Sequence, residues 1–113
     1  MRAALAVLCA LWLGTPTGAA LAQRTAATAT ETRLLYTEGK KAAEAREYDR
    51  AEELFRQALE RITHSATRAN ILNDLGETLY ELERFEEARD AFVEALDIRP
   101  DFVRARANLD IVG

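Results

Sequence analysis

Six core-type residues recur along this chain at one constant spacing, and this repetition limits the fold more than any other feature. Each residue of a first set has a counterpart of the same or similar size 37 positions later. The pairs are Gly39 and Gly76, Tyr48 and Phe85, Ala51 and Ala88, Phe55 and Phe92, Ala58 and Ala95, and Leu59 and Leu96. Such a pattern indicates an internal repeat, in which each unit buries its apolar face against its neighbour.

The later copy, residues 72–100, has the pattern of two amphipathic helices joined by a tight turn. Three small residues, Gly76, Ala88 and Ala95, stand where bulky side chains would hold the two helices apart. We expect Phe85 and Phe92 to fill the volume that remains between them.

This copy resembles a tetratricopeptide repeat, a helix–turn–helix unit with the pattern W-x2-L-G-x2-Y…A-x3-F…P. The residues that match as written are Leu75, Gly76, Ala88, Phe92 and Pro100, while Leu72 and Leu79 stand in place of the Trp and Tyr. The earlier copy keeps Leu35, Gly39, Ala51 and Phe55, and has Glu38, Ala42 and Thr63 in place of the motif Leu, Tyr and Pro. The resemblance runs from about residue 32 to the C-terminus. It implies a fold but no particular partner, because repeats of this kind serve many functions.

The predicted fold is all-α, a tetratricopeptide-like solenoid of antiparallel helix–turn–helix repeats within residues 31–113. Two full repeats are expected at about residues 32–65 and 69–102, followed by a capping helix at 101–112. The individual helices are predicted at residues 31–46, 49–62, 66–82, 86–98 and 101–112. In the last of these, Arg106 and Asp110 occupy the positions of Leu72 and Gly76. A charged outer face of this kind is what the end of a solenoid requires.

The N-terminus has the pattern of a secretory signal peptide. Met1 and Arg2 precede an apolar run at residues 3–13, and Ala20-Leu21-Ala22 provides a cleavage site with small residues. We therefore predict cleavage after Ala22, an exported protein that is periplasmic or secreted, and no stable membrane span after cleavage. An uncleaved membrane anchor is the alternative interpretation. Residues 23–30, which are small and polar, are predicted to form a flexible spacer.

Composition and motifs argue against catalysis and nucleic-acid binding. The formal net charge is −4 at pH 7, whereas nucleic-acid-binding domains carry clustered Lys and Arg. His64 is the sole histidine and lacks a second metal ligand at useful spacing. The sequence contains no Gly-rich phosphate loop. We predict a protein that is not an enzyme and that has no cofactor and no metal.

Binding is the remaining class of function, and the resemblance implies where it would occur. In tetratricopeptide arrays the first helix of each pair lines a concave surface. This places the following candidate partner-binding residues there: Arg33, Tyr36, Lys40, Asn70, Asn73, Glu77, Tyr80 and Arg104. None of them is expected to be needed for the core. We predict a scaffold that binds a protein or a peptide, since Asn pairs with main chains and Tyr offers apolar area with a hydroxyl.

Two alternatives stay open from the sequence. These eight residues are also compatible with an ordinary solvated face, because protein surfaces are polar in general. The chain is also compatible with a self-associating structural module of an envelope assembly. About three repeats are usually needed for stability, and a homo-oligomer would supply the missing contacts.

Overall fold

The computed structural model describes residues 18–63 and 65–113, and all the regular structure in this part of the chain is helical. The elements are α2 (Gly18–Glu44), α3 (Tyr48–Arg61), α4 (Ser65–Glu81), α5 (Phe85–Ile98) and α6 (Val103–Val112). The predicted all-α repeat fold is confirmed. The apolar segment of the predicted signal peptide and His64 lie outside the described residues.

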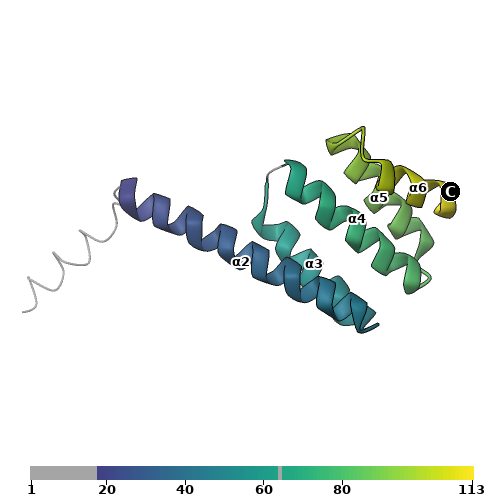
Figure 1. The fold of residues 1–113 in the computed structure, drawn as a ribbon, viewed down its shortest axis with the longest axis horizontal. Coiled ribbons are helices and arrows are strands. Elements are labelled where there is room, and N and C mark those ends of the chain that lie inside the picture. Colours follow the sequence, from purple (N-terminus) through teal and green to yellow (C-terminus); the bar gives the residue numbers. More distant parts are fainter. Residues whose placement is uncertain (1–17, 64) are drawn as a thin grey trace, which may run out of the picture.

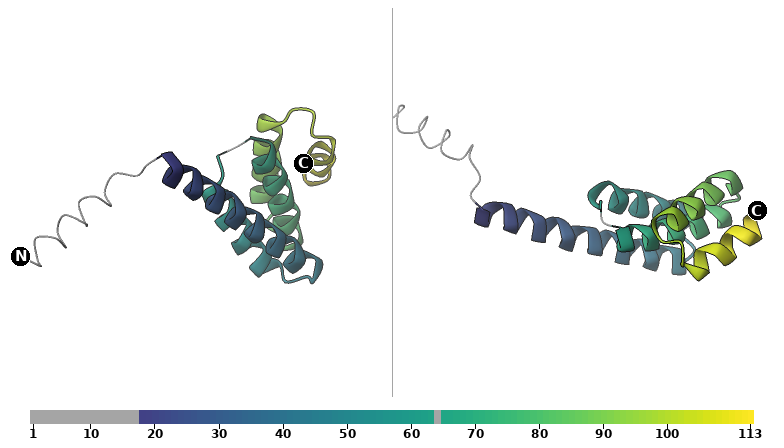
Figure 2. Two further views of the ribbon diagram at one scale, coloured as in Figure 1. Left: turned by 60° about the vertical axis from the view of Figure 1, so that its left-hand side comes forward. Right: turned by 90° about the horizontal axis from the view of Figure 1, so that it is seen from above.

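The helices form two antiparallel pairs and one further helix. Helix α2 packs along α3, α4 packs along α5, and α6 lies against α5 and α4 (Figures 1 and 2). Helices α3 and α4 join the two pairs, so the array continues from one repeat to the next. The predicted bounds of the last four helices hold to within two residues.

Helix α2 begins much earlier than the sequence predicts. Residues 23–30 are helical, so the prediction of a flexible spacer is wrong. Alanine has the highest helix propensity, and extending a helix that packing has already nucleated costs little free energy. The hydroxyls of Thr28 and Thr30 donate to main-chain carbonyls one turn earlier, those of Arg24 (2.8 Å) and Ala26 (3.0 Å). This part of α2 extends beyond the end of α3 (Figures 1 and 2).

The core is built around a phenylalanine ring that lies on a glycine in each repeat. Phe55 and Phe92 are 0% and 1% exposed. A Cβ atom built on Gly39 would lie 2.6 Å from Cε1 of Phe55, and one on Gly76 would lie 2.5 Å from Cε1 of Phe92. Both distances are too short for a real contact, so only glycine lets the paired helices approach this closely.

Alanine residues at matching positions complete this packing. Ala51, Ala58, Ala88 and Ala95 are all fully buried. One expectation is wrong: Phe85 is 47% exposed and does not fill the space between α4 and α5. It is the first residue of α5, and its ring instead meets the edge of Tyr80, with 5.3 Å between the ring centroids.

The turn within each repeat also recurs at the same spacing. Arg46 and Glu83 have φ angles of 62° and 61°, in the left-handed region. After α2, the N–H of Glu47 donates to the carbonyl of Ala42, and after α4 the N–H of Arg84 donates to that of Leu79 (2.8 and 2.9 Å). This Schellman pattern satisfies the last carbonyls of α2 and α4 and fixes the direction in which the next helix starts.

Two arginines join the repeats. At one end, Arg68 of α4 donates to the carbonyls of Leu59 and Ile62 at the end of α3 (3.1 and 3.2 Å) and to Glu94 of α5 (3.2 Å). At the other end, Arg84 contacts both Glu52 of α3 and Glu87 of α5.

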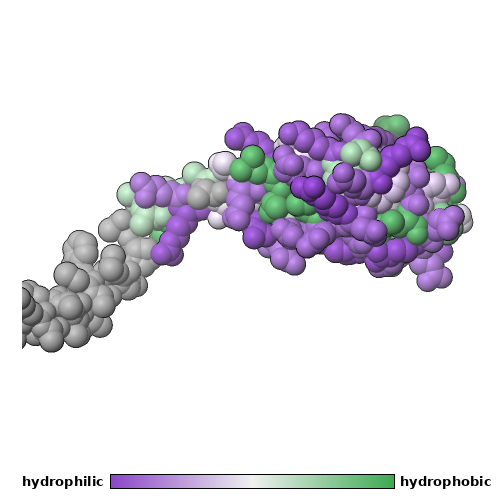
Figure 3. Space-filling model, turned by 90° about the horizontal axis from the view of Figure 1, so that it is seen from below, coloured by the Kyte–Doolittle hydropathy of each residue, from purple (hydrophilic) through white to green (hydrophobic). Residues whose placement is uncertain are grey.

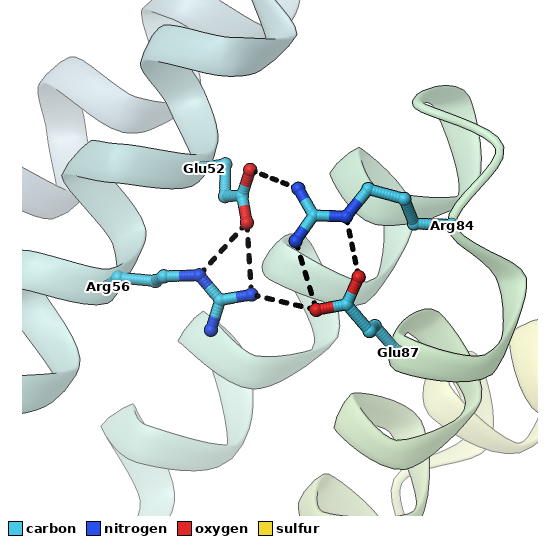
Figure 4. A network of polar contacts seen from close by, with 4 residues as sticks. All are labelled: Glu52, Arg56, Arg84 and Glu87. Carbon is cyan, nitrogen blue, oxygen red and sulfur yellow. Dashed lines mark hydrogen bonds and ion pairs between the residues drawn. The ribbon is translucent and has the colours of Figure 1, made fainter.

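The second joint is a ring of four alternating charges (Figure 4). Arg84 lies 2.5 Å from carboxylate oxygens of both Glu52 and Glu87, and Arg56 lies 2.9 Å from Glu52 and 3.7 Å from Glu87. The hydrogen bond from Arg84 lowers the pKa of the Glu87 carboxyl. Ion pairs that form a network around a bidentate arginine contribute more to folding stability than isolated surface ion pairs do.

We predict that Gly76→Ala lowers the free energy of unfolding by about 1–3 kcal/mol, because the added methyl group must displace the buried ring of Phe92. Chemical denaturation measures this. Gly18→Ala, made in the same full-length chain, is the matched control, since nothing lies within 4 Å of the Cβ atom it would add. Equal stabilities for the two variants would contradict the close packing of α4 on α5.

We predict that Arg84→Ala lowers the melting temperature, because Glu52 and Glu87 on neighbouring repeats then share only Arg56, which lies 3.7 Å from Glu87. The lowered pKa of Glu87 means that this stabilisation is present above the ordinary glutamate pKa of about 4.5 and is lost as the pH falls below it. The difference from the wild type should therefore shrink at low pH and in high salt.

Arg89→Ala removes an exposed cation from α5 that has no ion pair in the described part of the chain, so it serves as the control. A melting temperature for Arg84→Ala that equals that of Arg89→Ala at all pH values would show that the charge ring does not stabilise the joint.

Candidate functional site

The first helix of each pair and the last helix together line a groove. Helices α2 and α4 run in the same direction across the array (Figure 1), and α6 lies against α4 and α5. The groove has a volume of about 480 Å³. Its lining includes Lys40 and Glu44 of α2, Asp74, Glu77, Tyr80 and Glu81 of α4, and Arg104, Asn108, Ile111 and Val112 of α6. The rings of Phe55 and Phe92 also reach the groove, so the glycine contacts that close each repeat also shape it.

Four of the eight residues predicted to bind a partner lie together in this groove. Lys40, Glu77, Tyr80 and Arg104 are part of its lining, whereas Arg33, Tyr36, Asn70 and Asn73 are not. Arg33 is exposed near the middle of α2. Asn70 is half-buried and accepts a hydrogen bond from Arg99 (3.1 Å), so it serves the joint between α4 and the end of α5.

Asn73 is fully buried, which contradicts the expectation that it is a free side chain of the inner face. Its amide donates to Oε1 of Glu77 (3.2 Å), and its carbonyl oxygen accepts from Asn108 of α6 (3.0 Å). Asn108 also donates to Glu77 (2.9 Å), and Arg104 lies 3.0 Å from the same carboxylate. These residues form a polar joint that holds α6 against α4.

Sequence reasoning missed this joint because the family resemblance places Asn73 on the inner face of its helix without showing which element covers that face. A following helix covers that position, and Asn108 was not considered as its partner. An Asn at the matching face of each of two neighbouring helices is the signal that predicts the pair, since buried amides need hydrogen-bonding partners.

Tyr36 and Asp74 connect α2 to α4. The Tyr36 hydroxyl donates to Oδ2 of Asp74 at 2.5 Å. Burial raises the pKa of Tyr36 well above its ordinary value, and the hydrogen bond to Asp74 raises it further. Burial also raises the pKa of Asp74, with a contribution from the nearby charge of Glu77, while the bond from Tyr36 lowers it in part. Ionised Asp74 therefore opposes folding at neutral pH, and this cost disappears as the pH falls.

The remaining groove residues are available to a ligand. Lys40 is exposed, with its ammonium group 5.4 Å from the centre of the Tyr36 ring. Tyr80 is 37% exposed and Ile111 is 67% exposed. Glu44 and Glu81 are exposed and form no ion pair or hydrogen bond within the described residues. The groove thus presents polar and apolar side chains that the core does not use.

The comparisons with known proteins agree with this architecture. Residues 33–101 match the profile described as tetratricopeptide repeat, which is more than half of the chain. The chain belongs to the tetratricopeptide repeat family. Membership in this family points to protein–protein interaction as the general function.

A similarity to one curated protein covers part of the chain. Over 65 residues, the chain is 40% identical to a peroxisomal targeting signal receptor of Candida albicans. These 65 residues are 58% of this chain. The match spans about a tenth of that receptor's own length. It therefore supports a shared repeat domain.

Two other features are absent from the described part of the chain. These residues contain no group of three His, Cys, Asp or Glu side chains that would hold a metal ion. No helix within residues 18–63 and 65–113 has both the length and the apolar character of a membrane span.

We predict that Asn73→Ala lowers the free energy of unfolding by about 1–3 kcal/mol, because it removes a fully buried amide together with its hydrogen bonds to Glu77 and from Asn108. Denaturant titration followed by circular dichroism measures the change. Asn70→Ala is the matched control, and its cost should be smaller because Asn70 is only half-buried. A cost for Asn73→Ala no larger than that of Asn70→Ala would contradict the polar joint.

Proposed function

We propose that this chain is an exported interaction module that binds an extended segment of a partner protein in the groove between α2, α4 and α6. The observation that carries the proposal is the set of exposed groove side chains, which come from all three helices and lie outside the buried core. Lys40, Tyr80, Glu81 and Ile111 are examples. They combine apolar area with charge and hydrogen-bonding capacity, as protein-binding surfaces do.

The dimensions of the groove support an extended segment as the ligand. A volume of about 480 Å³ holds a few side chains and not a folded domain. The groove is lined by residues from three helices, α2, α4 and α6. A segment lying across them would contact one helix after another.

Surface character supports binding of this kind over extensive self-association. On the face shown in Figure 3, hydrophobic residues form small separate patches within a largely hydrophilic surface. Large continuous apolar patches are the usual mark of an obligate interface. Self-association remains the alternative function, and Val103 of α6, which is 80% exposed, is the side chain that favours it most.

Export is the second part of the proposal, and it rests on the N-terminal sequence pattern. Cleavage after Ala22 would remove Gly18–Ala22 from α2 and leave the rest of that helix in place. Intact-mass measurement of the protein produced in its native host decides this. A mature chain that begins at Gln23 supports export, and a full-length chain in a membrane fraction contradicts it.

We predict that Tyr80→Ala weakens binding of a captured partner at least fivefold, because it removes exposed aromatic area from the groove. Quantitative affinity capture with purified chain measures this, and circular dichroism verifies that the variant is folded. Arg89→Ala, on the outer helix α5, should bind like the wild type. An equal loss of partner binding in Tyr80→Ala and Arg89→Ala would contradict binding in the groove.

Mass measurement at increasing protein concentration separates this function from self-association. The proposal expects a monomer that binds its partner. An oligomer whose formation is abolished by Val103→Glu, with no groove-dependent partner, would favour the structural module instead.

A further inference from the structure

The groove contains more negative charge than its own cations neutralise. Of the lining residues, all of which the structure describes, four are carboxylates and two are cations. One carboxylate, Glu77, is already paired with Arg104 and accepts from Asn73 and Asn108. Asp74 accepts a hydrogen bond from Tyr36 and lies near the charges of Arg104 and Lys40, so Glu44 and Glu81 are the lining carboxylates that have no partner in the described residues.

The two exposed carboxylates lie where the helices themselves are negative. Glu44 is the last residue of α2 and Glu81 is the last residue of α4. Because α2 and α4 run in the same direction, their C-termini are at the same edge of the array (Figure 1). A helix C-terminus carries about half a negative charge, which favours a cation nearby.

The chain does not supply that cation from its own last turns. Helix α4 has no basic residue in its last turn. Helix α2 has Lys41 there, but its ammonium group lies 3.4 Å from Glu38. Apolar groove side chains, among them Ala43, Tyr80 and Ile111, line the same cavity as the unpaired carboxylates. This combination fits a long aliphatic side chain that ends in a positive charge.

We propose that the groove selects a partner segment that carries lysine or arginine, with its cationic group at the edge formed by Glu44 and Glu81. This rests on the proposed function, because it specifies the chemistry of the segment that the groove binds. The stem of the basic residue packs on Tyr80 and Ile111. A segment that presents a carboxylate at this edge is excluded by repulsion from Glu44, Asp74 and Glu81.

The raised pKa of Asp74 is consistent with this charge excess, since Glu77 contributes to it. A cationic ligand would favour the ionised form of Asp74 and relieve part of the cost that its burial imposes. The groove therefore has a destabilising charge that a basic ligand compensates.

The test uses the full chain and a phage-displayed library of random 12-residue peptides. Selected peptides are synthesised, and their dissociation constants are measured by fluorescence anisotropy. We expect the selected sequences to be enriched in Lys and Arg. We also expect replacement of the basic residue by glutamate to weaken binding more than tenfold, and added salt to weaken it as well.

The decisive variant is the double substitution Glu44→Gln and Glu81→Gln, which removes both charges from exposed positions without structural partners. This double variant should bind the basic peptides with dissociation constants about three- to tenfold higher than those of the wild type. The control is the double substitution Glu60→Gln and Glu86→Gln, which removes the same charge from the outer helices α3 and α5. This control should bind like the wild type.

The outcomes separate the charge preference from the binding function. Peptides that lack basic residues but lose affinity in Tyr80→Ala would overturn the charge preference and leave the groove as the binding site. Basic peptides that bind the Glu44→Gln, Glu81→Gln variant as tightly as the Glu60→Gln, Glu86→Gln control would also overturn the charge preference. A library that yields no peptide sensitive to Tyr80→Ala would contradict the proposed function itself.

Discussion

The contact of a phenylalanine ring with a glycine in the facing helix determines the rest of this structure. It occurs twice, between Phe55 and Gly39 and between Phe92 and Gly76, and neither site has room for a Cβ atom. The close approach fixes how each helix pair packs, and the alanines beside it can then be fully buried. Because the same rings reach the groove, the contact that stabilises a repeat also sets the floor of the candidate binding site.

Much of the fold could be predicted from the sequence, because packing at a close helix crossing allows few residue types. The spacing of Gly39 from Gly76 and of Phe55 from Phe92 identified the repeat and the helix order. The extension of α2 through residues 23–30 could not be predicted in this way. Composition suggested a spacer there, whereas a helix nucleated by packing further along continues through alanine and threonine at little cost.

The candidate site was predicted less well, for a physical reason that Asn73 illustrates. Its place on the inner face of α4 was anticipated, but the inner face near the end of an array is covered by the next helix. Asn73 is therefore buried against Asn108 and serves the joint, while Lys40 and Tyr80, further from that joint, stay exposed. A repeat pattern predicts which face a residue occupies, but not whether another element covers that face.

The central claim is that a partner segment binds the face formed by α2, α4 and α6. Amide chemical-shift mapping of the full chain during titration with a bound peptide tests it most directly. The account predicts that the largest shifts occur at Lys40, Glu44, Tyr80, Glu81 and Ile111, with small shifts along the outer faces of α3 and α5. Shifts concentrated at exposed residues of α3 and α5, such as Glu60 and Arg89, would contradict it.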